Sequence, residues 1–236
     1  MINILIPMAG RGSRFAEMGY KLPKPLIDVN GMPMIELVFR NLNMDGHYIF
    51  IALKEHEDKY NVSVLLKSLK PDCDIIYLDS VTDGACRTAL MAQAHIDNDS
   101  PLIISNSDQL VKWDSSDFLL KCAMSQCDGS IVTLTKNETK YSYARMENGL
   151  VVEVAEKKVI SDRATAGIYY YQHGSDFVKF AKRMIGKDIR TNNEFYICPV
   201  YNEFILDGKN ITEYRVERMD CLGNPEDLRT YMLGNR

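Results

Sequence analysis

The chain has 236 residues, of which 46% are hydrophobic and 25% are charged, and its formal net charge is −4. This size and composition suit one globular domain with a full hydrophobic core. The negative charge and the lack of a Lys/Arg block argue against nucleic-acid binding, and no membrane span or signal peptide is recognisable, so we expect a cytoplasmic protein.

Strand-like and helix-like segments alternate along the first half of the chain, which predicts βαβ units around a largely parallel sheet. The predicted strands are residues 2–7, 47–53, 75–78 and 101–105, and the predicted helices are residues 34–42, 56–69 and 84–95. Asp83 or Thr82 is expected to cap the last of these helices.

The second half adds an antiparallel element. Asn148-Gly149 separates two strand-like runs, 143–147 and 150–156, and this dipeptide favours a tight hairpin turn. The other predicted strands are 129–135, 164–171 and 211–216, and the predicted helices are 114–126, capped by Asp114 or Ser115, then 175–185, 196–206 and a last one opened by Asn224-Pro225.

The cysteines and histidines form no recognisable metal or disulfide pattern. The six cysteines include no Cys-x-x-Cys pair, and the four histidines, at positions 47, 56, 95 and 173, show no zinc-ligand spacing. We therefore expect reduced, mostly buried thiols and structural or surface histidines.

The most informative stretch is the first strand and the turn that follows it. Gly10 and Gly12 allow the backbone to turn its N–H groups toward an anion, and Arg11, Arg14 and Lys24 supply positive charge nearby. The pattern predicts a phosphate-binding loop at the carboxyl edge of the sheet. The alternative is a plain turn with solvated basic residues.

Two familiar phosphate loops do not match this stretch. A Walker A loop requires Lys after its last glycine, where this chain has Ser13, and a dinucleotide fingerprint requires a third glycine, where it has Phe15. What remains, Gly-x-Gly-Ser-Arg-Phe followed by Lys24-Pro25, resembles the signature of the nucleotidyltransferases that make sugar nucleotides and related activated phosphates.

This resemblance extends over nearly the whole chain. It implies an α/β fold, a Rossmann-like αβα sandwich with a mixed, mainly parallel central sheet and a small antiparallel hairpin lobe. It also implies catalytic roles for Arg14 and Lys24. The nucleotide-binding residues that it implies are Met8, Ala9, Gly10, Arg11, Gly12, Ser13, Thr82, Asp83, Gly84, Ala85, Asn106 and Ser107.

Two acids are the expected ligands of a Mg²⁺ cofactor. Asp108 follows the predicted strand 101–105, and hard oxygen ligands at such an edge suit Mg²⁺. Asp220 lies in a segment that resembles the family's late motif, in which Gly-Thr-Pro-Glu-Asp-Leu follows a metal-binding aspartate. A turn or capping aspartate and a solvated loop acid are the respective alternatives.

Four further residues are expected to bind the acceptor. Glu156 and Lys157 resemble the family's Glu-Lys-Pro segment, although Lys158 replaces the proline. Gly167 and Glu194 also stand in segments that resemble acceptor-binding parts of the family. Surface ion pairs are an equally good interpretation of the three charged residues.

These patterns together predict an enzyme that condenses a nucleoside triphosphate with a small phosphorylated acceptor. We expect CTP and a phosphorylated polyol, sugar or choline, because compact members of the family include many cytidylyltransferases, and we expect a role in capsule or cell-surface glycan synthesis. The acceptor's phosphate is already largely ionised at neutral pH, so no general base is required.

Three alternatives stay open at this point. They are a thymidylyl- or uridylyltransferase for hexose 1-phosphates, a nucleotide-sensing domain without turnover, and a glycosyltransferase, for which Asp72-x-Asp74 has the letters but lies in a predicted loop. We expect one domain, 1–236, with a nucleotide-binding part at about 1–135, an acceptor-binding part at about 136–215 and a metal-binding strand and helix at about 216–236. A homodimer is compatible with the sequence.

Overall fold

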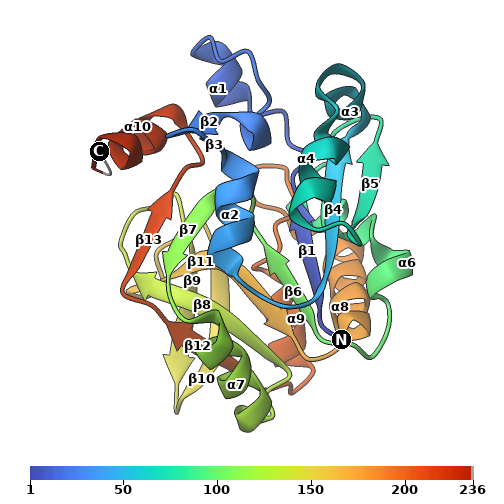
Figure 1. Cartoon of the computed structure of the whole chain (residues 1–236). Helices are drawn as coiled ribbons and strands as arrows, with labels where there is room; N and C mark the ends of the chain where they lie inside the picture. Colours follow the sequence, from blue (N-terminus) through green and yellow to red (C-terminus); the bar gives the residue numbers. More distant parts are fainter. Residues whose placement is uncertain (235–236) are drawn as a thin grey trace.

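A computed structural model describes residues 1–234 and shows a twisted mixed sheet with helices on both faces (Figure 1). The strands of this sheet are β1 (Asn3–Pro7), β4 (His47–Leu53), β5 (Asp74–Leu78), β6 (Leu102–Ser105), β8 (Gly129–Thr135), β9 (Ser142–Glu147), β10 (Leu150–Glu156), β11 (Arg163–Tyr171) and β12 (Ile211–Arg215). Their order is β10-β9-β11-β6-β1-β4-β5, with β8 paired to both β11 and β12.

The two halves of the sheet differ in strand direction. β6, β1, β4 and β5 are parallel to one another, whereas β11 is antiparallel to β6, β8 and β9. β11 therefore joins the antiparallel half of the sheet to the parallel half at β6, and the carboxyl ends of the parallel strands lie at one edge. The predicted α/β fold with a mixed central sheet is confirmed.

The strands are apolar on both faces because each face is covered by helices. Ile4 and Ile6 of β1 pack in one hydrophobic cluster with α2 (Met34–Leu42), α4 (Val62–Leu69) and α7 (Ser115–Ser125). Leu5 points the other way, into a second cluster with α5 (Ala85–Leu90), α8 (Gly174–Gly186) and α9 (Val200–Leu206). The two clusters place the core on both sides of the sheet.

Several short elements surround the carboxyl edge of the parallel strands. They are α1 (Ser13–Glu17), the 3₁₀ helix η1 (Lys24–Leu26), the β2–β3 pair (Asp28–Val29 and Met32–Pro33), the β7–β13 pair (Gln109–Lys112 and Arg218–Cys221) and α10 (Pro225–Gly234). The predicted final part, 216–236, thus contains β13 and α10, and its last two residues lie outside the described ones.

Several predictions are confirmed in detail. The helix at Met34–Leu42 and the strands at His47–Leu53 and Gly129–Thr135 have their predicted bounds. Asn148 and Gly149 both have positive φ angles, 50° and 81°, as the hairpin turn between β9 and β10 requires. Asp114 caps α7 by accepting hydrogen bonds from two backbone N–H groups of its first turn.

The predicted helix 56–69 is wrong as a single element. It consists of α3 (Lys54–Tyr60) and α4, separated at Asn61, whose φ of 49° interrupts the helical path. The Glu57 carboxylate accepts hydrogen bonds from the N–H and hydroxyl of Ser63, which stabilises the start of the second helix.

Two further helix predictions are corrected. The predicted helix 84–95 is two short helices, α5 and α6 (Gln93–Ile96), and no side chain caps the first of them, because Asp83 instead pairs with Arg87. The predicted helix 196–206 begins only at Val200, after Pro199, because the preceding residues follow a loop that lines a cavity described below.

The cysteines are reduced, as the sequence predicts. All six cysteines are free thiols, and five of them are buried. Among the described residues, no helix is long and apolar enough to cross a membrane.

Candidate functional site

Two cavities adjoin at the carboxyl edge of the parallel strands. The first, here called the loop cavity, has a volume of about 570 Å³ and lies between the glycine-rich turn and the start of α5. Among the predicted nucleotide-binding and catalytic residues, it is lined by Met8, Ala9, Gly10, Arg11, Gly12, Ser13, Lys24, Thr82, Gly84, Ala85 and Ser107. The structure therefore gathers most of the predicted nucleotide site around one space.

The second cavity, here called the hairpin cavity, has a volume of about 470 Å³ and lies beside the β9–β10 hairpin. It is lined by seven of the predicted residues, Arg14, Ala85, Asn106, Asp108, Glu156, Lys157 and Gly167. Ala85 and Tyr196 line both cavities, so the two spaces are neighbours. Glu194, predicted to bind the acceptor, lines the loop cavity instead.

An ion pair joins the two cavities. Lys24 lines the loop cavity and Asp108 lines the hairpin cavity, and the Lys24 Nζ lies 2.7 Å from the Asp108 Oδ2. Both side chains are about one-fifth exposed, at 22% and 18%. The partial burial strengthens the attraction between them relative to a surface pair.

Gly12 fixes the approach of Lys24 to the glycine-rich turn. Its φ of 61° lies in the left-handed region, and a Cβ on it would lie 3.1 Å from the Lys24 Cβ. The glycine-rich turn and Lys24 are thus packed together, as expected for a lysine that supplies positive charge to this loop. A positive charge is held beside the backbone N–H groups of an exposed loop, which is an arrangement suited to phosphate.

The two predicted metal ligands line different cavities. The N–H of Leu222 donates to the Asp108 carbonyl, and Cys221 and Gly223 line the hairpin cavity with Asp108. Asp220 pairs with Leu110 in the β7–β13 ladder, accepts hydrogen bonds from Arg218, and lines a separate cavity.

Two other acids share the hairpin cavity with Asp108: Glu156, at the end of β10, and Asp227, in the first turn of α10. Cys221 also lines this cavity, but burial raises the pKa of its thiol to about 12, so it stays protonated at neutral pH. The ligands available beside Asp108 are therefore oxygen atoms, which suit Mg²⁺.

Residues that the sequence analysis did not assign also belong to the site. Tyr196 was placed in a helix, but its hydroxyl donates to the Glu194 carboxylate at 2.5 Å and accepts a hydrogen bond from Lys157. Lys157 Nζ also lies 4.4 Å from the centre of the Tyr196 ring. These hydrogen bonds connect Glu194, which lines the loop cavity, to Lys157, which lines the hairpin cavity.

Gln109 is a second residue that was missed, because the short strand β7 has no clear sequence pattern. Its side-chain oxygen is buried without a hydrogen-bond partner among residues 1–234, and the residue lines the hairpin cavity. Gly167, with a φ of 69°, leaves room for it, since a Cβ there would lie 2.0 Å from that oxygen. A buried acceptor without a partner costs free energy, which a ligand donor can relieve.

Asp83 does not line the loop cavity but connects the segments that form its wall. Its carboxylate pairs with Arg87 at 2.7 Å and with Arg190 at 2.9 Å, and its carbonyl accepts the N–H of Phe195. The Arg190 guanidinium also lies 3.8 Å from the centre of the Phe195 ring. The turn at 82–85 is thereby fixed against the segment that carries Glu194.

We expect Gly84→Ala to disrupt this contact. Gly84 has a φ of 130°, and a Cβ there would lie 2.4 Å from the Phe195 carbonyl oxygen. The free energy of unfolding should fall by about 1–3 kcal/mol, the usual cost of such backbone strain. Urea unfolding measures this change. Gly208→Ala is the control, because it has a φ of 78° but no atom within 4 Å of its Cβ; equal losses in both variants would contradict the role of the Phe195 contact.

Glu156 is a partly buried acid in the hairpin cavity, and its carboxylate accepts a hydrogen bond from Ser142. Burial raises the pKa of Glu156 above its ordinary value of 4.5, against the opposing effects of Ser142 and Lys157. A carboxyl whose folded-state pKa is raised contributes its stability below the unfolded-state pKa and loses it as the pH rises through the folded-state value.

Glu156→Gln should therefore raise the free energy of unfolding at about pH 7, by roughly 0.5–2 kcal/mol, and change it little at about pH 4. Urea unfolding at both pH values measures the difference. Glu153→Gln, on the same strand and paired with Arg145, is the control. A gain at about pH 4 as large as that at about pH 7 would show that the charge of Glu156 is not what costs stability.

The chain is similar to known proteins over most of its length. It is 24% identical over 230 residues to the bifunctional protein GlmU of Streptococcus gordonii, which covers 92% of this chain and 47% of that protein. It is 39% identical over 74 residues, 28% of this chain and 30% of that protein, to a 2-aminoethylphosphonate cytidylyltransferase of Lancefieldella rimae. The matched part of the chain thus spans less than half the length of each of these curated relatives.

Solved structures share the fold at low sequence identity. A nucleoside-diphosphate-sugar pyrophosphorylase of Vibrio cholerae RC9 has a TM-score of 0.83 at 23% identity, covering 98% of this chain and 99% of that one. A UDP-glucose pyrophosphorylase complexed with UDP-glucose has a TM-score of 0.79 at 20% identity, with 100% and 98% covered. The inositol-1-phosphate CTP transferase of T. maritima has a TM-score of 0.77 at 13% identity, with 99% and 93% covered.

The sequence profile described as nucleotidyl transferase matches residues 4–227, which includes the glycine-rich turn, Lys24, Asp108 and all of β13. The glycine-rich turn, Lys24, Asp108 and Cys221 of β13 are among the residues that line the two adjoining cavities. On this match the chain belongs to the nucleotidyl transferase family.

Proposed function

We propose that this protein is a Mg²⁺-dependent nucleotidyltransferase that joins a nucleoside triphosphate, preferably CTP, to a small phosphorylated acceptor and releases pyrophosphate. The observation that carries the proposal is the 2.7 Å pair between Lys24 and Asp108. It lies where a loop suited to a triphosphate adjoins a second cavity large enough for a small acceptor. The nucleotide would occupy the loop cavity and the acceptor the hairpin cavity.

In the proposed reaction an oxygen of the acceptor's phosphate attacks the α-phosphorus of the triphosphate, and the bond from that phosphorus to the departing pyrophosphate breaks. A phosphate monoester has a second pKa of about 6, so its oxygen is already largely ionised at neutral pH. The protein then needs to position the two anions and to stabilise negative charge. Lys24 lies where it can bind the triphosphate, and Arg14 lies in the acceptor's cavity.

The oxygen ligands beside Asp108 fit Mg²⁺, which binds phosphates through one or two carboxylates and several waters. When bound, the ion would neutralise phosphate charge. We propose Asp108 as its main protein ligand. Glu156 and Asp227 are the other carboxylates in the same cavity, and Asp227 accepts hydrogen bonds from Lys140 and Asn224. Asp220, the partner expected from the late motif, accepts hydrogen bonds from Arg218 and lines a neighbouring cavity.

Lys24 neutralises the Asp108 carboxylate in this structure. Binding of a magnesium triphosphate would separate this pair, since Lys24 would turn to the phosphates and Asp108 to the ion. The positive charge and the carboxylate would thus each exchange one partner for another. This exchange avoids leaving either partly buried charge unpaired.

The preference for CTP rests on two observations. The 74-residue segment that is 39% identical to a cytidylyltransferase supports a cytosine nucleotide. The turn at 82–85, which would meet the base, is short. The Thr82 hydroxyl already forms hydrogen bonds within it, to the Gly84 carbonyl and the Thr88 hydroxyl, so it is not available to the base. A pyrimidine amino group could then be read by backbone carbonyls.

The proposed acceptor is a phosphorylated polyol, sugar or choline. The hairpin cavity combines acids, Glu156 and Asp227, with the rings of Tyr141, Tyr169 and Tyr196. Acids and aromatic rings suit hydroxyl groups and also a cationic amine. We propose that such a product serves capsule or cell-surface glycan synthesis, and that the protein acts in the cytoplasm, where nucleoside triphosphates are available.

The test is a comparison of pyrophosphate release with CTP, UTP, dTTP, GTP and ATP, each with glycerol, glucitol, choline and hexose phosphates. We expect the fastest release with CTP and a polyol phosphate or phosphocholine. Faster release with UTP or dTTP and a hexose 1-phosphate would replace the proposed substrates by those of a hexose-1-phosphate nucleotidyltransferase. Tight nucleotide binding with no release for any pair would indicate a sensing domain.

A further inference from the structure

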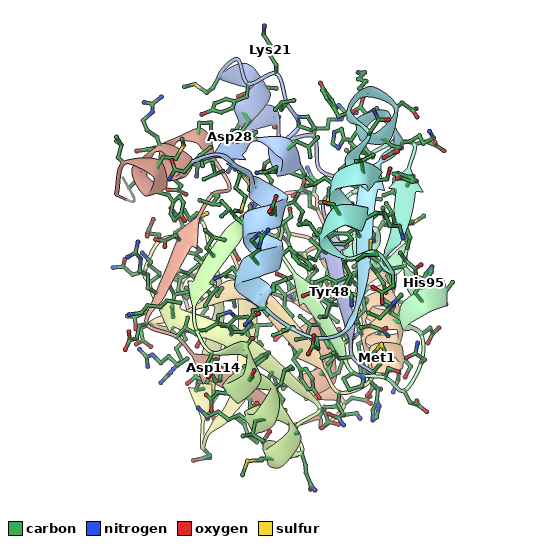
Figure 2. All side chains as sticks on the ribbon, viewed as in Figure 1. Met1, Lys21, Asp28, Tyr48, His95 and Asp114 are labelled. Atoms are coloured by element: carbon green, nitrogen blue, oxygen red, sulfur yellow. The ribbon has the colours of Figure 1, made fainter. Side chains whose placement is uncertain are left out.

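Three side chains meet at the end of the sheet opposite the two cavities. His47 is the first residue of β4, Asp74 is the first residue of β5, and His95 belongs to α6. The His47 Nε2 lies 2.8 Å from the Asp74 Oδ2, and the His95 Nδ1 lies 2.9 Å from the same oxygen. Figure 2 shows His95 on the side of the molecule near Met1, away from Lys21 and Asp28.

The strand register and a helix contact bring these residues together. Asp74 pairs with Ile49 in the parallel β4–β5 ladder, so the amino ends of both strands lie at one edge. The helix α6 packs on α8 and presents His95 to this edge. His47, Asp74 and His95 are far apart along the chain and share no common spacing, so the sequence alone predicts isolated histidines.

The geometry fits a transition-metal ion. The three ligand atoms lie within 4.8 Å of one another. In a tetrahedral zinc site, with bonds of about 2.0–2.1 Å, ligand atoms are about 3.3 Å apart. The two nitrogen–oxygen distances would lengthen by about 0.4–0.5 Å, from 2.8 and 2.9 Å, to reach this spacing, and an ion would replace the two hydrogens that now join the imidazoles to the carboxylate.

The donor set also decides which ion is suitable. Two imidazole nitrogens with one carboxylate oxygen suit Zn²⁺ and its neighbours, whereas Mg²⁺ prefers oxygen ligands alone. The side chains are 29%, 41% and 38% exposed for His47, Asp74 and His95, so an ion can enter and water can take the fourth position. The Mg²⁺ of the proposed reaction would not fill this site.

We propose that His47, Asp74 and His95 form a binding site for a divalent transition metal, with Zn²⁺ as the preferred ion. Its ligands come from the edge strand β5, its neighbour β4 and α6. A helix of this length is not stable by itself, so its position depends on tertiary contacts. The bound ion would join α6 to the edge of the sheet, and it would act on stability rather than on the reaction.

The test is calorimetric titration of the untagged full chain with Zn²⁺, in buffer that contains Mg²⁺. We expect one site per chain that is weakened at least about tenfold in His95→Gln and in Asp74→Asn, since even partners that only support a metal ligand contribute that much. His173→Gln is the matched control, because that histidine bonds to the Asp99 carbonyl and lies outside the cluster. It should bind Zn²⁺ like the parent.

Two further measurements, of the melting temperature and of a Co²⁺ absorption spectrum, test whether these three residues bind the ion. Saturating Zn²⁺ should raise the melting temperature of the parent and of His173→Gln, but not that of His95→Gln. The absorption spectrum of bound Co²⁺ should show nitrogen and oxygen ligands without a thiolate band. Absence of Zn²⁺ binding by the parent, equal binding by His95→Gln, or a thiolate band would overturn the proposal. None of these results depends on the proposed transferase activity.

Discussion

Replacing Asp108 by asparagine is expected to lower the rate of pyrophosphate release at least about 100-fold, because even a residue that only supports a metal ligand contributes up to that factor. Asparagine keeps the size of the side chain and can still accept a hydrogen bond from Lys24, which now lies 2.7 Å from the Asp108 carboxylate. What it removes is the negative charge that would hold Mg²⁺. The measurement is the steady-state rate over a range of Mg²⁺ concentrations.

The control for this variant is Asp45→Asn, which changes an exposed acid on the loop before β4, at the opposite edge of the sheet. It should retain the parent's rate. Full activity of Asp108→Asn at low Mg²⁺ would remove Asp108 from the metal site. Parallel tests of Asp220→Asn and Asp227→Asn would identify the second carboxylate, since only the residue that shares the ion should match the loss in Asp108→Asn.

Replacing Lys24 by alanine is the second change with a large expected effect. We expect kcat to fall by a factor of ~10² to 10³, the usual cost of losing one group that stabilises charge in the transition state. The KM for the triphosphate should rise less. The reason is that the charge of Lys24 matters most as negative charge moves toward the departing pyrophosphate, after the ground-state complex has formed.

Lys21→Ala is the matched control for Lys24→Ala. Lys21 is an exposed lysine three positions earlier that lines a different, smaller cavity. It should leave both kinetic constants unchanged. A Lys24→Ala variant with the parent's kcat but a raised KM would limit Lys24 to ground-state binding, and unchanged values of both would exclude it from the site.

The nucleotide side of the site was readable from the sequence because its signals are local. Gly10 and Gly12 follow a continuous apolar strand, and Lys24 follows within a dozen residues. The fold then had only to place this segment at the carboxyl edge of the parallel strands, which it does for any strand of a βαβ unit. The bounds of α2, β4 and β8 were predictable for the same reason, because their patterns are long and end at clear turn signals.

The acceptor side was only partly readable, because its positions are set by distant pairings. Asp108 and Asp220 look equivalent in sequence, but the β7–β13 ladder leaves Asp220 beside Arg218 and in a different cavity from Asp108. The sequence predicts a helix from Tyr196, whereas the backbone hydrogen bonds of Phe195 to Asp83 and Cys86 hold the preceding residue in a loop, and the helix begins only at Val200. Such tertiary hydrogen bonds override local helix propensity.

The most direct test of the account follows the oxygen atoms of the acceptor. The acceptor's phosphate is labelled with a heavy oxygen isotope, the protein is incubated with it, CTP and Mg²⁺, and both products are analysed by mass spectrometry. Attack on the α-phosphorus predicts that all of the label is retained in a diphosphate-linked product and that the pyrophosphate carries none. Label in the released pyrophosphate, or no diphosphate-linked product with any nucleotide and acceptor, would contradict the proposed nucleotidyl transfer.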